Sequence, residues 1–290
     1  MKNSLINKIC LGTAQFGFEY GINNPRGKIP QREVFEILLY CHQIGINYLD
    51  TAYNYGESET VIGKFLRQNT KSWDLKIITK LPENENVREV FMESLNRLGI
   101  RKTYGYLVHN FEFFRKKNYI WDRMVQLKRE GKTEKIGFSL YFPEEYYIIK
   151  DLEIDILQIP YNIFDRRFET LLPELKRKGI EIHTRSAFLQ GLIFKKPDEL
   201  NGKFIKIKDR LIYLTELARE SGLPLSSIFL NFCSINKYID KVLIGVDNLE
   251  QLKNNIDFLS YHESVTGIYK KLLELKEDDE DIILPLRWKT

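Results

Sequence analysis

Two short apolar runs, NYLDT at residues 47–51 and KIITK at residues 76–80, decide how this 290-residue chain folds. Each run has the length of one buried strand, and the segment between them is long enough for a helix and its two connections. A strand, a helix and a second strand in this order form a repeat that joins parallel strands. The two runs therefore predict a parallel sheet that is covered by helices.

The same alternation continues along the rest of the sequence. Eight apolar runs are predicted as strands, at residues 8–13, 47–51, 76–80, 105–109, 135–139, 155–160, 181–186 and 241–246. Between them, hydrophobic residues recur at the i, i+3, i+4 and i+7 spacing of an amphipathic helix from Val34 and from Phe168, and a similar stripe begins at Leu249. Gly45 and Gly179 follow helical segments, where a left-handed residue commonly ends a helix.

Eight such repeats in about 250 residues have the size of a closed (β/α)8 barrel, the TIM barrel. An open doubly wound sheet is the alternative, but the sequence has no GxGxxG phosphate-binding loop. No Pro-, Gly- or Ser-rich linker interrupts the series. We therefore expect a single α/β domain over residues 1–290, in which residues 262–290 form a C-terminal tail that packs on or near the barrel.

Composition excludes several classes of protein. Hydrophobic residues make up 43% and charged residues 29% of the chain, which is typical of a globular protein. Lys and Arg outnumber Asp and Glu by 44 to 40 but are scattered, so we expect no nucleic-acid partner. The three cysteines are far apart, so we expect no disulfides. We find no signal peptide and no membrane-spanning run, so we expect a cytoplasmic protein without a membrane partner. We expect it to be a monomer or a weak homo-oligomer.

Ionisable residues stand where three consecutive predicted strands end. Asp50 ends the second strand, Lys80 the third and His109 the fourth. Because the active site of a (β/α)8 barrel lies at the C-terminal ends of its strands, these side chains should share one rim. A buried carboxylate, ammonium and imidazole would each be costly alone, but together they compensate one another. The loop after Asp50 contains Tyr55, which can add a phenol.

A metal-dependent reaction is disfavoured by the histidines. The sequence has only His42, His109, His183 and His262, and no HxH or HExxH pair occurs among them. His42 is expected on a helix and His183 in the middle of a strand. We therefore predict that the protein has no metal site.

The residues around Asp50 resemble a known family. The segment LDTAYNYGESE at residues 49–59 is similar to the signature of the aldo-keto reductases. LGT (11–13), TK (79–80), LVH (107–109), IGFS (136–139) and QIPYN (158–162) match further motifs of that family in the same order. The resemblance implies an NAD(P)H-dependent oxidoreductase that reduces an aldehyde or ketone, sugar-like compounds included, to an alcohol.

The resemblance also implies the catalytic residues, which are Asp50, Tyr55, Lys80 and His109. In such a set Lys80 would lower the pKa of the Tyr55 phenol, and Asp50 would hold Lys80 charged. His109 would hydrogen-bond the carbonyl oxygen. Hydride would then pass from nicotinamide to the carbonyl carbon while Tyr55 protonates the oxygen. The alternative function is a nicotinamide-binding regulatory or partner subunit with little activity of its own.

The resemblance further implies a cofactor site in the loops after the strands. NADP is the expected cofactor, and NAD is the alternative. The preference for NADP is weaker than usual in the family, because Asp247 would repel a 2′-phosphate and neither Val246 nor Gln251 is basic. Arg185 stands where many relatives stack an aromatic ring on the nicotinamide. The implied cofactor-binding residues are Gly12, Thr13, Asp50, Ser139, Gln158, Arg185, Ser186, Phe188, Gln190, Gly191, Ile244, Gly245, Val246, Asp247, Gln251 and Asn255.

Aromatic residues in the same loops predict where the substrate binds. They are Phe16, Tyr20, Tyr53, Tyr141 and Phe142, together with Phe164. An aromatic rim suits a small carbonyl substrate that carries a ring or resembles a sugar, and it also suits a simple aldehyde.

Overall fold

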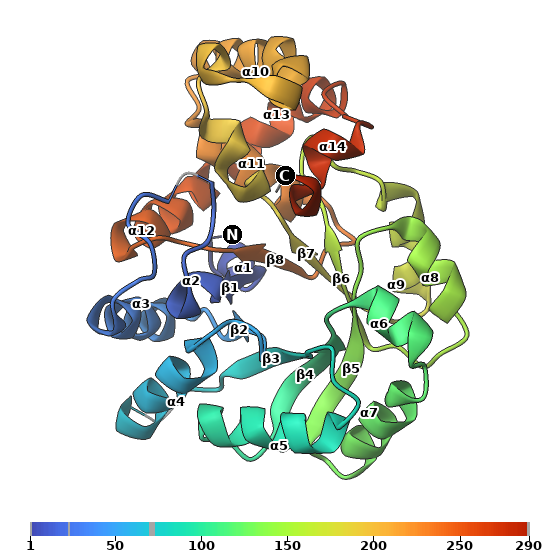
Figure 1. Ribbon diagram of the computed structural model, residues 1–290. Coiled ribbons are helices and arrows are strands. Elements are labelled where there is room, and N and C mark those ends of the chain that lie inside the picture. The colour runs from blue at the N-terminus through green and yellow to red at the C-terminus, as the bar shows by residue number, and fades with distance from the viewer. Residues whose placement is uncertain (1, 23, 70–72, 289–290) are drawn as a thin grey trace.

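The computed structural model describes residues 2–22, 24–69 and 73–288 of the chain. Within them, eight parallel strands close into a barrel in sequence order (Figure 1). The predicted (β/α)8 barrel is therefore confirmed, and each strand ends within two residues of its prediction. The strands are β1 (Ile9–Gly12), β2 (Tyr48–Asp50), β3 (Lys76–Leu81), β4 (Thr103–Val108), β5 (Thr133–Ser139), β6 (Ile156–Pro160), β7 (Glu181–Arg185) and β8 (Lys241–Ile244).

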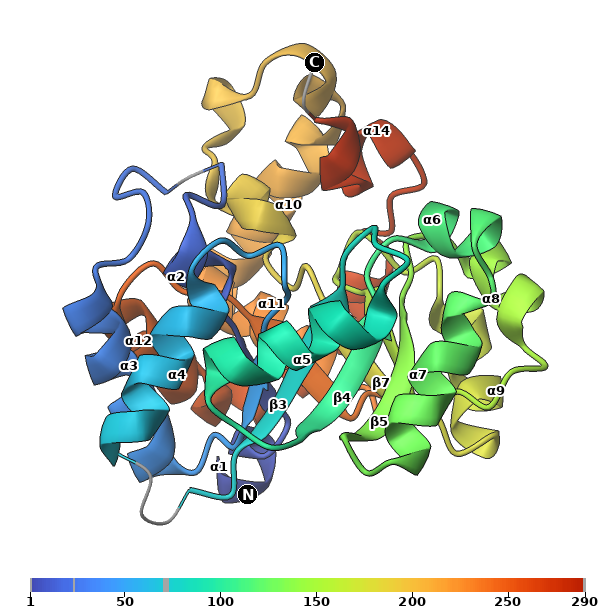
Figure 2. The same ribbon diagram turned by 60° about the horizontal axis from the view of Figure 1, so that its bottom comes forward.

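Helices surround the barrel, and shorter ones occupy its two ends (Figures 1 and 2). Figure 2 shows α1 (Lys2–Ile6) at one end and α14 (Glu280–Ile283) at the other. The remaining helices are α2 (Ala14–Gly17), α3 (Gln31–Ile44), α4 (Ser58–Asn69), α5 (Val87–Leu98), α6 (Phe111–Lys116), α7 (Ile120–Arg129), α8 (Pro143–Ile149), α9 (Leu172–Arg177), α10 (Lys208–Glu220), α11 (Leu225–Ile235), α12 (Leu249–Phe258) and α13 (His262–Leu273). None of the described helices is both long and apolar enough to cross a membrane.

Two of the predicted hydrophobic stripes form regular helices, and one does not. The stripe from Val34 lies on the buried face of α3, which ends at Gly45 with a left-handed φ of 82°. The stripe from Leu249 lies on α12. The stripe from Phe168 instead forms a 3₁₀ turn (Glu169–Leu171) followed by the short helix α9. Pro173 is the reason, because it lacks the N–H that a continuous α-helix would need there.

The inside of the barrel is filled by layers of different polarity. Alternate residues of a strand point to the same face, so Lys76, Ile78 and Lys80 of β3 lie at successive levels. Ile78 belongs to the middle, apolar level, which also contains Cys10, Leu107, Ile156 and Leu243. The polar residues at the two ends of the barrel are therefore separated by a buried hydrocarbon layer.

The segment after β8 returns to the C-terminal end of the barrel. Helix α13 packs against α11, and α14 is followed by a 3₁₀ turn (Pro285–Arg287). Ion pairs fix this turn, since the Arg287 guanidinium lies 2.6 Å from a carboxylate oxygen of Glu280. Trp288 packs edge-on against Phe204, with 5.0 Å between the ring centres.

Two helical glycines offer a test of how tightly the outer helices pack. A Cβ added to Gly63 of α4 would overlap the carbonyl oxygen of Arg97 at the contact with α5, whereas a Cβ on Gly267 of α13 would meet nothing within 4 Å. We expect Gly63→Ala to cost about 2–3 kcal/mol of stability through overpacking. Gly267→Ala should stabilise by about 0.5–1 kcal/mol because alanine favours the helix. Thermal unfolding of both variants measures the two effects, and equal shifts would contradict the close α4–α5 contact.

Candidate active site

A buried ion pair lies where β2 and β3 end. Lys80 Nζ donates to Asp50 Oδ1 at 2.5 Å and to the backbone oxygen of Thr51 at 2.7 Å. The second carboxylate oxygen of Asp50 accepts a hydrogen bond of 2.7 Å from Gln158 Nε2, at the end of β6. All three side chains are almost completely buried. Each charge thus has several partners, which a buried ion pair needs to offset its lost hydration.

Tyr55 and His109 complete the group of four predicted catalytic residues. Lys80 Nζ lies 4.9 Å from the centre of the Tyr55 ring, and the rings of Tyr55 and His109 meet edge to face at 5.8 Å. The Tyr55 loop lies tightly against α2, because a Cβ on Gly17 would overlap the Tyr55 carbonyl. Three strand ends and one loop therefore bring these four side chains together.

The electrostatics of the group follow from burial. Burial raises the pKa of the Tyr55 phenol, with further contributions from Asp50 and Tyr141 that outweigh Arg185. This direction is opposite to the lowering expected from Lys80, because burial has the largest effect and the Asp50 carboxylate also raises this pKa. Burial also lowers the pKa of His109 to about 3, and the charges of Lys80 and Arg185 act in the same direction. Tyr55 is therefore protonated and His109 neutral at physiological pH.

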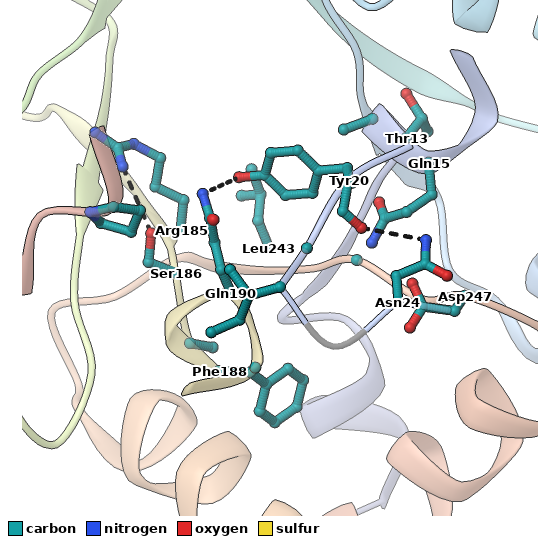
Figure 3. A pocket seen from close by; sticks show the side chains of 18 of the residues that line it. Thr13, Gln15, Tyr20, Asn24, Arg185, Ser186, Phe188, Gln190, Leu243 and Asp247 are labelled. Atoms are coloured by element: carbon teal, nitrogen blue, oxygen red, sulfur yellow. Dashed lines mark hydrogen bonds between the residues drawn. The ribbon is translucent and has the colours of Figure 1, made fainter. Parts of the chain in front are cut away.

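A cavity of about 1050 Å³ opens above these residues (Figure 3). It extends from Tyr55 and His109 to the start of α12. Of the residues implied as cofactor-binding, those that line it are Gly12, Thr13, Asp50, Ser139, Gln158, Arg185, Ser186, Phe188, Gln190, Gly191, Gly245, Asp247, Gln251 and Asn255. Ile244 and Val246 do not line it, because their side chains point into the hydrophobic core. Lys80 lies just beneath the floor and reaches the cavity only through Asp50 and Tyr55.

Two loops meet over the cavity. Gln190 Nε2 donates to the Tyr20 hydroxyl at 3.0 Å, and Ile22 N donates to the carbonyl oxygen of Gln190 at 3.2 Å. The loop after β7 has left-handed backbone at Ser186, Leu189 and Gln190, with φ of 64°, 45° and 50°. Such strained conformations are uncommon outside glycine and concentrate at ligand sites.

Two of the six aromatic residues predicted to bind the substrate line the cavity. Tyr20 and Tyr141 line the cavity, and the guanidinium of Arg185 lies 4.0 Å from the centre of the Tyr141 ring. Phe16, Tyr53, Phe142 and Phe164 do not line it.

Each of these four has another packing partner. Phe16 belongs to α2 and is buried in the core, and Phe164 packs against Phe229. Tyr53 turns outward, where its hydroxyl donates to Glu93 at 2.7 Å. Phe142 precedes α8, and the guanidinium of Arg167 lies over its ring. Loop aromatics therefore pack against helices as readily as they face a site.

Several residues of the cavity were not anticipated. Gln15 follows β1, and its amide occupies the space beside Gly245, where an added Cβ would lie 2.7 Å from Gln15 Nε2. The C-terminal segment supplies Pro285, Leu286 and Trp288 as one wall. The Trp288 indole donates to the backbone oxygen of Ile282 at 3.0 Å, which holds that wall in place. Neither segment carries a periodic pattern that would have pointed to this position.

Among the described residues, no group of three or more His, Cys, Asp or Glu side chains could hold a metal ion. The cavity floor instead offers a phenol, an imidazole, a hydroxyl and an amide, from Tyr55, His109, Ser139 and Gln158. This set can donate protons and hydrogen bonds to a polar group placed above it.

Comparison with known proteins adds to this picture. The model of the Aldo/keto reductase family matches residues 8–273. L-galactose dehydrogenase of Arabidopsis thaliana is 25% identical over 90% of this chain and 88% of its own length, and NADH-specific methylglyoxal reductase of Escherichia coli is 30% identical over 65% of both. An aldo-keto reductase from Bacillus halodurans, solved in its holo form, has a similar fold, with a TM-score of 0.72, 21% identity and 94% coverage of both chains.

The pKa of His109 predicts how stability depends on pH. Because this pKa falls from its usual 6.5 to about 3 on folding, the unfolded chain binds more protons between these values. Stability should therefore fall as the pH drops below 6.5, and His109→Gln should remove this loss. Between about pH 6.5 and pH 5 the variant should gain at most about 2 kcal/mol on the wild type. Urea unfolding at several pH values measures this gain, and a constant difference would contradict the neutral imidazole.

Proposed function

Because the chain belongs to the aldo/keto reductase family, we propose that it reduces an aldehyde or ketone to an alcohol, with hydride from NAD(P)H and a proton from Tyr55. The observation that carries this proposal is the Lys80–Asp50 pair beneath Tyr55 and His109, at the floor of a cavity large enough for a dinucleotide and a substrate.

The cavity residues fit a nicotinamide dinucleotide. Ser139 and Gln158 lie on the floor, and the Gln158 carbonyl can accept a hydrogen bond while its amide serves Asp50. At the other end of the cavity, Gly245 has no side chain, so its own backbone and the Gln15 amide can approach a ligand closely. The planar guanidinium of Arg185 can stack on a ring. When bound, the cofactor supplies the hydride that the carbonyl carbon receives.

Tyr55 holds the proton that the carbonyl oxygen needs. Its raised pKa keeps the phenol protonated, and an alkoxide is a much stronger base than a phenolate, so the proton moves to the oxygen as negative charge develops there. The Lys80 ammonium lies over the ring that carries this proton, 4.9 Å from its centre. Asp50 accepts a hydrogen bond of 2.5 Å from Lys80 and holds it in place.

His109 contributes a hydrogen bond rather than a charge. With a pKa of about 3, its imidazole is neutral, so one ring nitrogen can donate to the carbonyl oxygen without competing with Tyr55 as an acid. This donor orients the carbonyl toward the phenol.

The walls of the cavity support a substrate that carries a ring or resembles a sugar. Phe18, Tyr20, Tyr141 and Trp288 supply aromatic surface, while the floor supplies the polar groups. The relatives named for L-galactose and for methylglyoxal both act on small oxygen-rich compounds. We place the reaction in the cytoplasm, which suits the buried free thiols of Cys10, Cys41 and Cys233.

The choice between the two cofactors depends on Asp247. The sequence resemblance favours NADP, but the half-buried Asp247 carboxylate lines the cavity, and a 2′-phosphate beside it would be repelled. Arg26 offsets this charge only in part, because its guanidinium also forms an ion pair of 3.0 Å with Glu33. A relative named as NADH-specific is consistent with this reading. We propose that both cofactors bind and that Asp247 sets their ratio.

The role of Tyr55 can be tested by Tyr55→Phe, which removes the proton and keeps the ring. We expect kcat on aldehydes and ketones to fall at least about 100-fold, with NAD(P)H binding by fluorescence unchanged. Tyr147→Phe is the control, because Tyr147 is exposed on α8. Full activity of Tyr55→Phe would refute the proton donor. A wild type that binds cofactor but reduces no compound of a broad panel would favour the alternative, a partner subunit.

Asp247→Ser tests the origin of cofactor preference. Removing the carboxylate should improve the Kd of NADPH relative to that of NADH by about 10-fold. Glu250→Gln removes a nearby exposed charge that does not line the cavity, so its ratio should match that of the wild type. Fluorescence titration with both cofactors gives the two ratios. An unchanged ratio in Asp247→Ser would mean that another group discriminates the 2′ position.

A further inference from the structure

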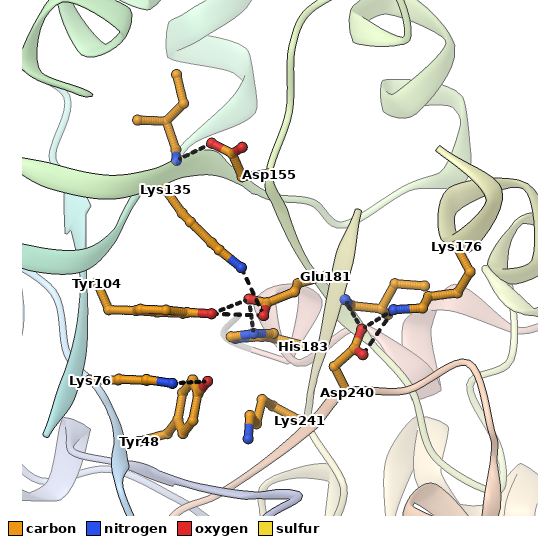
Figure 4. Close-up of polar contacts among 12 residues, drawn as sticks. Tyr48, Lys76, Tyr104, Lys135, Asp155, Lys176, Glu181, His183, Asp240 and Lys241 are labelled. Atoms are coloured by element: carbon orange, nitrogen blue, oxygen red, sulfur yellow. Dashed lines mark hydrogen bonds and ion pairs between the residues drawn. The ribbon is translucent and has the colours of Figure 1, made fainter. Parts of the chain in front are cut away.

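A second group of polar side chains fills the opposite, N-terminal end of the barrel (Figure 4). We call it the basal cluster, and it consists of Tyr48, Lys76, Tyr104, Lys135, Glu181, His183 and Lys241. The apolar layer around Ile78 and Leu243 separates it from Asp50 and Lys80. The basal cluster therefore takes no part in the reaction proposed above.

The one carboxylate of the basal cluster, that of Glu181, already has partners among its neighbours. Glu181 forms an ion pair of 2.9 Å with Lys135 and accepts hydrogen bonds from the Tyr104 hydroxyl, the shorter of 2.7 Å. The imidazole of His183 lies 3.4 Å from its other oxygen. Although burial acts against the charge, these contacts hold the pKa of Glu181 at about 2. Glu181 is thus fully ionised and committed to these partners.

Lys76 and Lys241 are left with no such partner. Within the described part of the chain, neither forms an ion pair with a carboxylate. Lys76 Nζ donates to the Tyr48 hydroxyl at 3.3 Å, and Lys241 Nζ lies 3.6 Å from the centre of the Tyr48 ring and donates to the backbone oxygen of Asn7. Burial lowers the pKa of Lys241 and the charge of Lys76 adds to this effect, while Cys10, Glu181 and Asp240 act in the opposite direction. Two ammonium groups therefore face one ring without a carboxylate in direct contact with either.

A cavity of about 220 Å³ lies between these two lysines. The indole of Trp73 donates to the side-chain oxygen of Asn47 at 2.9 Å, which leaves the Asn47 amide nitrogen as a donor toward the cavity. The exposed carboxylate of Asp74 opposes an anion, but the two ammonium groups outnumber it. The residues that line the cavity are Asn7, Gly45, Asn47, Tyr48, Asp74, Lys76 and Lys241.

We propose that this cavity binds a small phosphate, either the inorganic ion or the phosphoryl group of a metabolite, between Lys76 and Lys241. A water molecule takes up about 30 Å³, so the cavity has room for a tetrahedral oxyanion. Two ammonium groups, the Tyr48 hydroxyl and the Asn47 amide supply donors around it, and ammonium groups are common phosphate ligands in proteins. The anion would remove the repulsion between the lysines.

Calorimetric titration with inorganic phosphate at constant ionic strength tests this proposal. The protein is kept saturated with NADH, so that phosphate does not enter the large cavity. We expect saturable binding by the wild type, and at least a 10-fold weaker Kd for Lys76→Gln and for Lys241→Gln. Lys102→Gln is the matched control, because Lys102 is an exposed lysine that precedes β4 and pairs with Glu134. Lys241→Arg keeps the charge and should keep most of the affinity.

Three results would overturn the proposal. They are no saturable binding by the wild type, an affinity of both glutamine variants equal to that of the wild type, and a loss in Lys102→Gln as large as theirs. Circular dichroism and NADH binding of the variants show that each has folded, so a lost site is not mistaken for a lost structure. A parallel titration with methyl phosphate distinguishes the source, since tighter binding of the monoester favours a phosphorylated metabolite and tighter binding of the free ion favours inorganic phosphate.

Discussion

The buried ion pair of Lys80 and Asp50 is the constraint on which the rest of the site depends. Two charges without water are costly unless each has further partners, and here Thr51 and Gln158 provide them. Those partners come from the ends of β2 and β6, on different sides of the barrel, so only a closed barrel can deliver them. The pair in turn decides the electrostatics above it. The Asp50 carboxylate adds to the effect of burial on the pKa of Tyr55, and the enclosed site leaves His109 uncharged.

The barrel and the polar residues at the cavity floor could be predicted from the sequence because both depend on regular patterns. Strands that are buried on both faces are continuous apolar runs, and a polar residue at the end of such a run, such as Asp50 or His109, stands out. Loops have no such period, so the direction of Phe16 or Tyr53 could not be predicted. Gln15 and Trp288 were missed for the same reason, since only tertiary packing brings them to the cavity.

Local chemistry explains two expectations from the sequence that the structure does not meet. The stripe from Phe168 has a helical period, but one proline was enough to divide it into a 3₁₀ turn and a short helix. The pKa of Tyr55 was expected to fall beside an ammonium, and it rises because burial dominates and the Asp50 carboxylate acts in the same direction. In the first case a single residue reversed the expectation, and in the second case mainly burial did.

The wall formed by Pro285, Leu286 and Trp288 bears on how the site could evolve. It is attached through surface ion pairs such as Arg287 with Glu280 and through Phe204, whereas the Lys80–Asp50 pair is held by Thr51 and Gln158. Substitutions in this wall can therefore reshape the cavity without disturbing the ionised floor. The cavity can therefore come to admit a different molecule one residue at a time, without any change to the costly buried charges.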